Sequence, residues 1–289
     1  MVMFLVKILV VLSIIALKEL IFCDGAWAWG PVVHTVISCN ILESCSQILP
    51  AIASVIQPFP NEYIYGAISA DFFLWKGQKR KKGHSHNWET GFKFLQGVNS
   101  DKEAAYAYGF LSHLAADVIA HNYFVPDLIH RRLRSKRIGH FYTEAVADRF
   151  VGPMYLKIAR EILSMDHNDY DKVLRSSAVR NRYGLRARKH IFTQSVRISD
   201  YLYCLPVFYG RGKGQPHNME DERLALMIEL SFKLVKDLLS YPDSSACLSY
   251  DPIGSDNLRL ASKGRILSRL FNNRRSSGRF PIDQELLEL

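Results

Sequence analysis

The stretch Tyr108–Phe124, YGFLSHLAADVIAHNYF, decides the fold that we expect for this chain. It places His113, Asp117 and His121 at positions i, i+4 and i+8, so their side chains share one face of a helix. Their neighbours are small or apolar, which indicates a helix that is buried on most sides. Since a buried carboxylate is costly unless it is paired or bound to a cation, the stretch predicts either a hydrogen-bonded polar stripe or a set of metal ligands.

A second pair of residues favours the metal site. His140 and Glu144 are again one turn apart, on the next predicted helix. A histidine and a carboxylate at this spacing can bind one metal ion together, and metal sites in helical bundles are built from side chains on facing helices. The two helices would bring together five ligand-type side chains, more than a single tetrahedral zinc ion needs.

Further candidates lie upstream. Asp71 ends the helical segment IYGAISAD, and His86 follows a basic loop. His34 alone is more typical of a core or surface histidine. A free α-amino group at Trp29 would change that interpretation, because amine and carbonyl can chelate a metal ion while the His34 imidazole takes a third position.

The rest of the chain also indicates helices. We find no long strand-like alternation, and the long segments have apolar residues at helical spacing, with prolines between them. We therefore expect an all-α fold, a multi-helix bundle. The predicted helices are Val32–Ser46, Tyr63–Phe73, Lys102–Phe124, Ile138–Phe150, Tyr155–Ser164, Phe192–Cys204 and Asp221–Leu239.

The N-terminus is typical of a secretory signal peptide. Lys7 precedes a short apolar run, and Ala26-Trp27-Ala28 fits a cleavage site before Trp29. The run is too short to span a bilayer well. We expect residues 1–28 to be removed and the mature protein to be secreted or periplasmic. An uncleaved anchor and a lipoprotein signal ending at Cys23 are the alternatives.

The sequence leaves open both the pairing of the cysteines and the identity of an anionic binding partner. Cys39, Cys45, Cys204 and Cys247 would remain after cleavage and could form two disulfides or stand alone in the core. The 289 residues carry a net charge of +9, which favours anionic partners. A basic loop spans residues 76–82, and residues 251–289 read as a basic tail after a helical domain of residues 29–250.

The whole ordered set of candidate ligands resembles the zinc-dependent phospholipase C family. The matching residues are Trp29, His34, Asp71, His86, His113, Asp117, His121, His140 and Glu144. The resemblance spans residues 29–150 and implies an all-α catalytic domain that hydrolyses phospholipid at a membrane surface with three bound zinc ions. Size and helical periodicity extend the expected domain to residue 250. The resemblance also implies that Asp71 orients or deprotonates the attacking water. The basic loop would then draw the enzyme to an anionic membrane.

The resemblance distributes the ligands over three sites. The first zinc ion would be held by Asp71, His86, His113 and Asp117. The second would be held by His121, His140 and Glu144. The third would be held by the amine and carbonyl of Trp29, by His34 and by a bridging Asp117.

Three other functions stay open. The spacing of three residues between Asp117 and His121 resembles the catalytic domain of glycosylphosphatidylinositol-specific phospholipase D, so the bond that is cleaved is not fixed. The single-strand-specific zinc nucleases begin W-G-x-x-G-H, which Trp29 and His34 match in spacing. Glu144 stands where those nucleases carry aspartate, and the spacing of Asp117 and His121 departs from theirs too. Both features favour a lipid substrate, and no specific nucleic-acid partner is expected. A metal-binding protein without catalysis is the third. The sequence holds no G-x-S-x-G, P-loop or C-x-x-C motif.

Overall fold

The fold is all-α, as the sequence predicts. The structure is a computed structural model, and every regular element in the part of the chain that it describes is a helix. No helix among these residues is long and apolar enough to cross a membrane. The described residues are 29–72, 86–131, 146–177, 184–199, 219–270 and 280–289.

The first half of the bundle is built around one long helix, α6 (Asp101–Ile119), which continues through a π-helical turn, η3 (Ala120–Phe124). Ser100 caps the start of α6, since its hydroxyl accepts the Glu103 N–H at 3.3 Å. The other elements here are α2 (Pro31–Glu43), η1 (Cys45–Gln47), α3 (Pro50–Ile56), α4 (Pro60–Ser69), η2 (Ala70–Phe72), α5 (Trp88–Gln96) and α7 (Val125–Arg131).

Prolines mark helix starts as well as gaps between helices. Pro31, Pro50, Pro60 and Pro153 are the first residues of α2, α3, α4 and α9 (Pro153–Ser164). The first helical position suits proline, because the N–H that it lacks has no intrahelical partner there. The second half continues with α10 (Asn168–Ser177), α11 (Leu185–Arg197), α14 (Met219–Ser240), η4 (Ala246–Ser249), α15 (Ser255–Leu270) and α16 (Gln284–Leu287).

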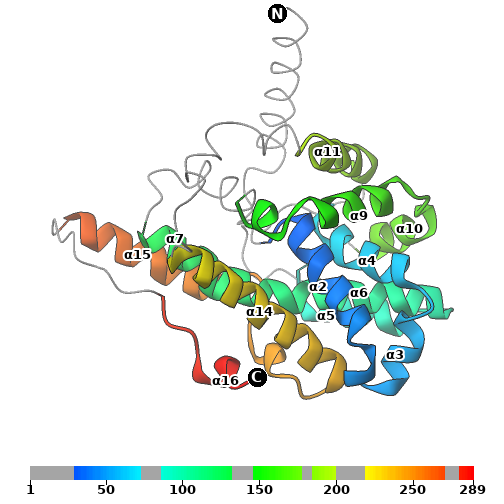
Figure 1. The fold of residues 1–289 in the computed structure, drawn as a ribbon, viewed down its shortest axis with the longest axis horizontal. Coiled ribbons are helices and arrows are strands. Elements are labelled where there is room, and N and C mark those ends of the chain that lie inside the picture. The colour runs from blue at the N-terminus through cyan, green and yellow to red at the C-terminus, as the bar shows by residue number, and fades with distance from the viewer. Residues whose placement is uncertain (1–28, 73–85, 132–145, 178–183, 200–218, 271–279) are drawn as a thin grey trace, which may run out of the picture.

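Helix α6 lies at the centre of the bundle and contacts α2, α3, α4, α5 and α14 (Figure 1). Its closest approach is to α4, where two glycines face the opposite backbone. A Cβ atom at Gly66 would collide with the Tyr106 carbonyl oxygen, and one at Gly109 would collide with the Tyr63 carbonyl oxygen. This backbone contact brings the last turn of α4, and η2 after it, against the polar face of α6.

Some predicted helices differ from those observed. Of the predicted helix Phe192–Cys204, residues 192–197 form the second half of α11, which begins at Leu185 and ends at Arg197. Residues 200–204 of that prediction lie outside the described residues. The predicted helix Ile138–Phe150 is described only from residue 146, and residues 146–151 are helical. Helices α3, α5, α7, α10, α15 and α16 were not predicted, because each is short or too polar for a long apolar stripe.

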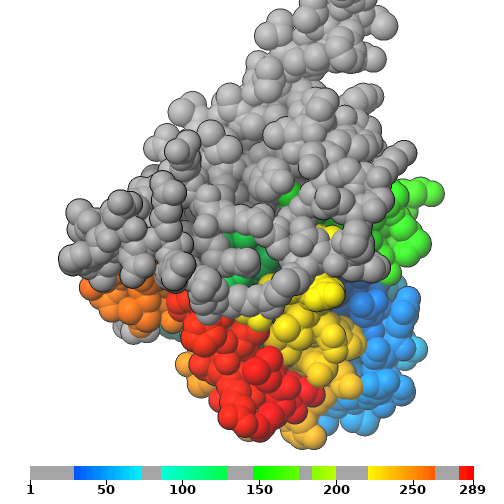
Figure 2. Space-filling model, turned by 60° about the vertical axis from the view of Figure 1, so that its left-hand side comes forward, coloured from blue at the N-terminus to red at the C-terminus, as the bar shows by residue number. Residues whose placement is uncertain are grey.

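The segment after residue 250, expected as a basic tail, has a packed part. Helix α15 contacts α7 and η3, and Leu286 of α16 is fully buried. Figure 2 shows the C-terminal residues (red) on the surface next to α14 (yellow) and α15 (orange). The Asp283 carboxylate accepts hydrogen bonds from the hydroxyls of Tyr123 (2.8 Å) and Tyr250 (2.9 Å), which ties this segment to η3.

The described cysteines are unpaired. Cys39, Cys45 and Cys247 are free thiols, and Cys204 lies outside the described residues. Burial raises the pKa of Cys247 to about 12, which keeps this thiol protonated and unreactive.

Candidate metal centre

Six of the nine predicted ligands meet in the core of the bundle. They come from α2, η2, the residue pair before α5, α6 and η3, and each is at most 1% exposed. They are His34, Asp71, His86, His113, Asp117 and His121. The structure therefore brings together side chains that lie up to 87 positions apart in the sequence.

Four donor atoms form a compact group, which we call the donor tetrad: Asp71 Oδ1, His86 Nε2, His113 Nε2 and Asp117 Oδ2. The two imidazole nitrogens are 3.0 Å apart. They lie 3.6 and 3.7 Å from Asp71 Oδ1, and 3.7 and 3.2 Å from Asp117 Oδ2. In a tetrahedral zinc site with bonds of 2.0–2.1 Å, neighbouring donors are about 3.4 Å apart. The five separations around the two imidazole nitrogens, 3.0–3.7 Å, are therefore close to those between neighbouring donors of one zinc ion.

The backbone of α4 fixes the orientation of His113. Its Nδ1 lies 2.8 Å from the Ala67 carbonyl oxygen, which can only accept a hydrogen bond. Nδ1 therefore carries the proton, and Nε2 presents its lone pair to the tetrad. Metal-binding histidines are commonly oriented in this way by a hydrogen bond from the second ring nitrogen.

Asp117 lies between four histidines. Its Oδ1 is 3.4 Å from His34 Nε2, and its Oδ2 is 3.3 Å from His121 Nε2. The other two histidines are those of the tetrad. A carboxylate whose two oxygens face different imidazoles has the arrangement that a bridge between two metal ions needs.

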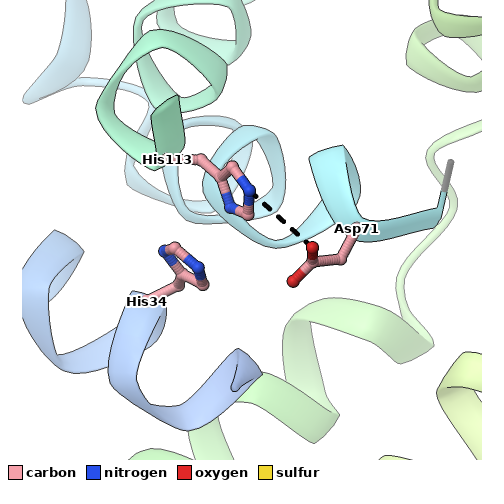
Figure 3. Close-up of side chains that lie close together, drawn as sticks. All are labelled: His34, Asp71 and His113. Carbon is pink, nitrogen blue, oxygen red and sulfur yellow. Dashed lines mark ion pairs between the residues drawn. The ribbon is translucent and has the colours of Figure 1, made fainter. Parts of the chain in front are cut away.

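His34, Asp71 and His113 point toward one another from α2, η2 and α6 (Figure 3). Their donor atoms lie within 4.8 Å of one another, as do those of His86, His113 and Asp117. The rings of His34 and His113 are stacked, with centroids 4.0 Å apart. Burial, together with the neighbouring His113, lowers the pKa of His34 to about 4, so His34 is neutral near pH 7. Neutral imidazole is the form that binds metal.

The His34 pKa predicts how the stability of the metal-free protein depends on pH. The folded pKa of about 4 is below the usual histidine value of 6.5, so the unfolded chain binds the extra proton as the pH falls between these values. Protonation of His34 should leave the unfolding free energy unchanged above pH 6.5 and should lower it by about 3 kcal/mol at pH 4. Urea unfolding with a chelator present measures this. His34→Gln should flatten the pH dependence, and an unchanged slope would contradict the assignment.

The polar atoms of the centre are poorly satisfied by protein groups. Neither ring nitrogen of His121, nor Nε2 of His34, has a hydrogen-bond partner among the described residues. Unsatisfied buried polar atoms are rare and call for an explanation such as a bound ion. Four buried imidazoles and two buried carboxylates together fit zinc, which prefers nitrogen, sulfur and carboxylate donors.

Trp29 is placed next to the centre, although its ligand role stays a prediction. Its side chain is fully buried. The indole N–H donates to Ser231 Oγ at 2.9 Å, and the ring stacks on Phe124 of η3 with centroids 4.6 Å apart. The other two predicted ligands, His140 and Glu144, lie outside the described residues, as does the basic loop of residues 76–82.

Asp148 is a site-forming residue that the sequence analysis did not single out. It is 4% exposed, and its Oδ1 accepts the Val33 N–H at 3.1 Å. It thereby anchors the start of α2, immediately before His34. A sequence pattern that could have identified Asp148 was present, because His140, Glu144 and Asp148 are spaced four residues apart.

This fold and this centre define a helical protein with a buried histidine–aspartate metal site. Residues 33–191, more than half of the chain, match the family described as zinc dependent phospholipase C. The chain belongs to that family and is a zinc metallohydrolase, which confirms the resemblance seen in the sequence. Neither the curated proteins nor the solved structures include a match to the chain.

Proposed function

We propose that this protein hydrolyses the phosphodiester of a membrane phospholipid on the glycerol side of the phosphate, with three zinc ions bound. The donor tetrad carries the proposal, because its dimensions fit one zinc ion and Asp117 faces further histidines beyond it. Residues 29–250 would form the catalytic domain of a secreted or periplasmic enzyme.

We assign the candidate ligands to the three ions as the resemblance implies. The tetrad residues would hold the first zinc ion. His121 would hold the second with His140 and Glu144, and His34 would hold the third with Trp29. Bound zinc would neutralise charge on the phosphoryl oxygens and lower the pKa of water toward about 7.

Asp71 is the residue that we assign to the attacking water. Asp71 comes from η2, and its Oδ1 lies 3.6 Å from His86 Nε2 and 3.7 Å from His113 Nε2. The Asp71 carboxylate would orient the water and accept its proton as the oxygen attacks phosphorus. The bond from phosphorus to the glycerol oxygen would break, and that oxygen would take a proton from solvent. The products would be diacylglycerol and a phosphorylated head group.

Product analysis tests this function. Zinc-loaded protein incubated with phosphatidylcholine or phosphatidylinositol vesicles should release diacylglycerol. Asp71→Asn should lower kcat by about 100-fold or more, because general-base assistance contributes roughly 10²–10⁴-fold. Phosphatidic acid as the product would indicate phospholipase D-type cleavage. Degradation of single-stranded DNA without lipid cleavage would overturn the proposal in favour of a nuclease.

A further inference from the structure

One loop in the C-terminal part of the chain contacts the residues around two predicted ligands, and we call it the brace loop (residues 250–254). It connects η4 to α15 and lies outside residues 33–191, the part that matches the family. We propose that the brace loop positions two metal ligands on different elements, His86 and His121, and thereby sets the zinc affinity of the centre. This inference rests on the ligand roles proposed above.

One end of the loop holds the segment that carries His86. The Trp88 indole N–H donates to the Tyr250 carbonyl oxygen at 2.9 Å. Trp88 is the first residue of α5 and follows His86 by two positions. This contact fixes the start of α5 relative to the loop, and with it the fully buried His86.

The middle of the loop holds the π-helical turn η3. Asn122, next to His121, donates from its side-chain amide to the Asp251 carbonyl oxygen at 2.9 Å. Asn257 of α15 donates to the Asn122 backbone oxygen at 3.1 Å and to its side-chain oxygen at 3.3 Å. A π turn leaves helical carbonyl groups out of register, and such turns are frequent at functional sites. Here the brace loop and α15 supply partners for that turn.

The last residue of the loop packs directly on a ligand residue. Gly254 has a φ of +62°, a conformation that glycine adopts readily and other residues rarely. A Cβ atom at this position would collide with the His121 carbonyl group and lie 2.9 Å from the His121 Cβ. Only glycine therefore lets the loop lie flat against the backbone of His121. A side chain here would displace either the loop or the ligand.

The chain offers a matched control for this contact. Gly184, before α11, also has a positive φ, of +89°, but a Cβ atom there would meet nothing within 4 Å. Gly184→Ala and Gly254→Ala thus share the backbone strain of alanine at positive φ. Only Gly254→Ala adds the collision with His121.

The experiment measures zinc bound per chain in the full-length protein, dialysed against buffers of fixed free zinc, together with the unfolding temperature. Gly254→Ala should raise the free zinc needed to fill one site by about tenfold or more, as expected when groups supporting a metal ligand are lost. Gly184→Ala should leave zinc binding within about twofold of the wild type. Equal binding by both variants would overturn the inference, whatever their stabilities.

Two further variants keep the outcome decisive. His121→Ala should bind one zinc ion fewer per chain than the wild type. If it binds as many zinc ions as the wild type, His121 is not a ligand, and the inference about the brace loop is wrong as well. If Gly254→Ala does not fold, Asn257→Ala replaces it, with exposed Lys263→Ala on the same helix as its control. Asn257→Ala should weaken zinc binding at least threefold relative to that control. Equal zinc binding by Asn257→Ala and Lys263→Ala would contradict the proposed role of the brace loop.

Discussion

Asp117→Asn should lower kcat/KM by about 10⁴-fold and reduce the zinc content of the protein. The substitution keeps the size of the side chain and removes its charge. Asp117 lies 3.2–3.4 Å from His34, His113 and His121, so it is the one carboxylate that the proposed ions share. Loss of metal-based charge stabilisation worth about 5 kcal/mol accounts for an effect of this size.

Asp171→Asn is the matched control for this prediction. Asp171 is also buried, at 8% exposure, but it accepts hydrogen bonds from Tyr65 and from Lys189 (2.6 Å) outside the metal centre. It should lower the unfolding free energy by about 1–3 kcal/mol and leave zinc content unchanged. Zinc content and vesicle hydrolysis distinguish the two variants. Wild-type zinc binding by Asp117→Asn would remove Asp117 from the ligand set.

Removal of zinc by a chelator should abolish lipid hydrolysis, and added zinc should restore it. The metal-free centre leaves buried imidazole nitrogens of His34 and His121 without hydrogen-bond partners among the described residues, so zinc should also stabilise the fold. Zinc at 100 times its dissociation constant contributes about 2.7 kcal/mol per site. For a domain of this size, each site should raise the unfolding temperature by about 5–10 °C.

Calorimetry and activity assays on one chelated sample check this prediction. Magnesium serves as the control ion, because it prefers six oxygen ligands and should restore neither stability nor activity. Full hydrolysis in the presence of chelator would contradict a zinc-dependent mechanism. An unfolding temperature that does not respond to zinc would contradict the assignment of the buried cluster as its site.

The candidate ligands on α6 could be predicted because residues spaced four apart lie on the same face of one helix. The positions of His113 and Asp117 follow from helical geometry alone. That His34 stacks on His113 depends instead on the close packing of α2, α4 and α6, which local sequence does not encode. Sequence order and residue type were enough to suggest a shared site, but only the packed bundle gives the distances of the donor tetrad.

The supporting contacts could not be foreseen for a related reason. Asp148, the brace loop and Asn257 act across long sequence separations, through single hydrogen bonds that leave no periodic pattern. The residues after 250 read as a tail because their composition is basic and polar. Their packing depends on a few apolar contacts, such as buried Leu286, and on the tie from Asp283 to Tyr123. Helix η3 was predicted as ordinary α-helix, since a π turn has no sequence signature of its own.

Native mass spectrometry of the protein expressed from its complete coding sequence tests the central proposal most directly, because one mass reports both the first residue and the number of bound metal ions. We expect a chain that begins at Trp29 and carries about three zinc ions, the number that the ligand set would hold. A chain with intact Met1, or one that binds fewer than two zinc ions, would contradict the three-zinc centre.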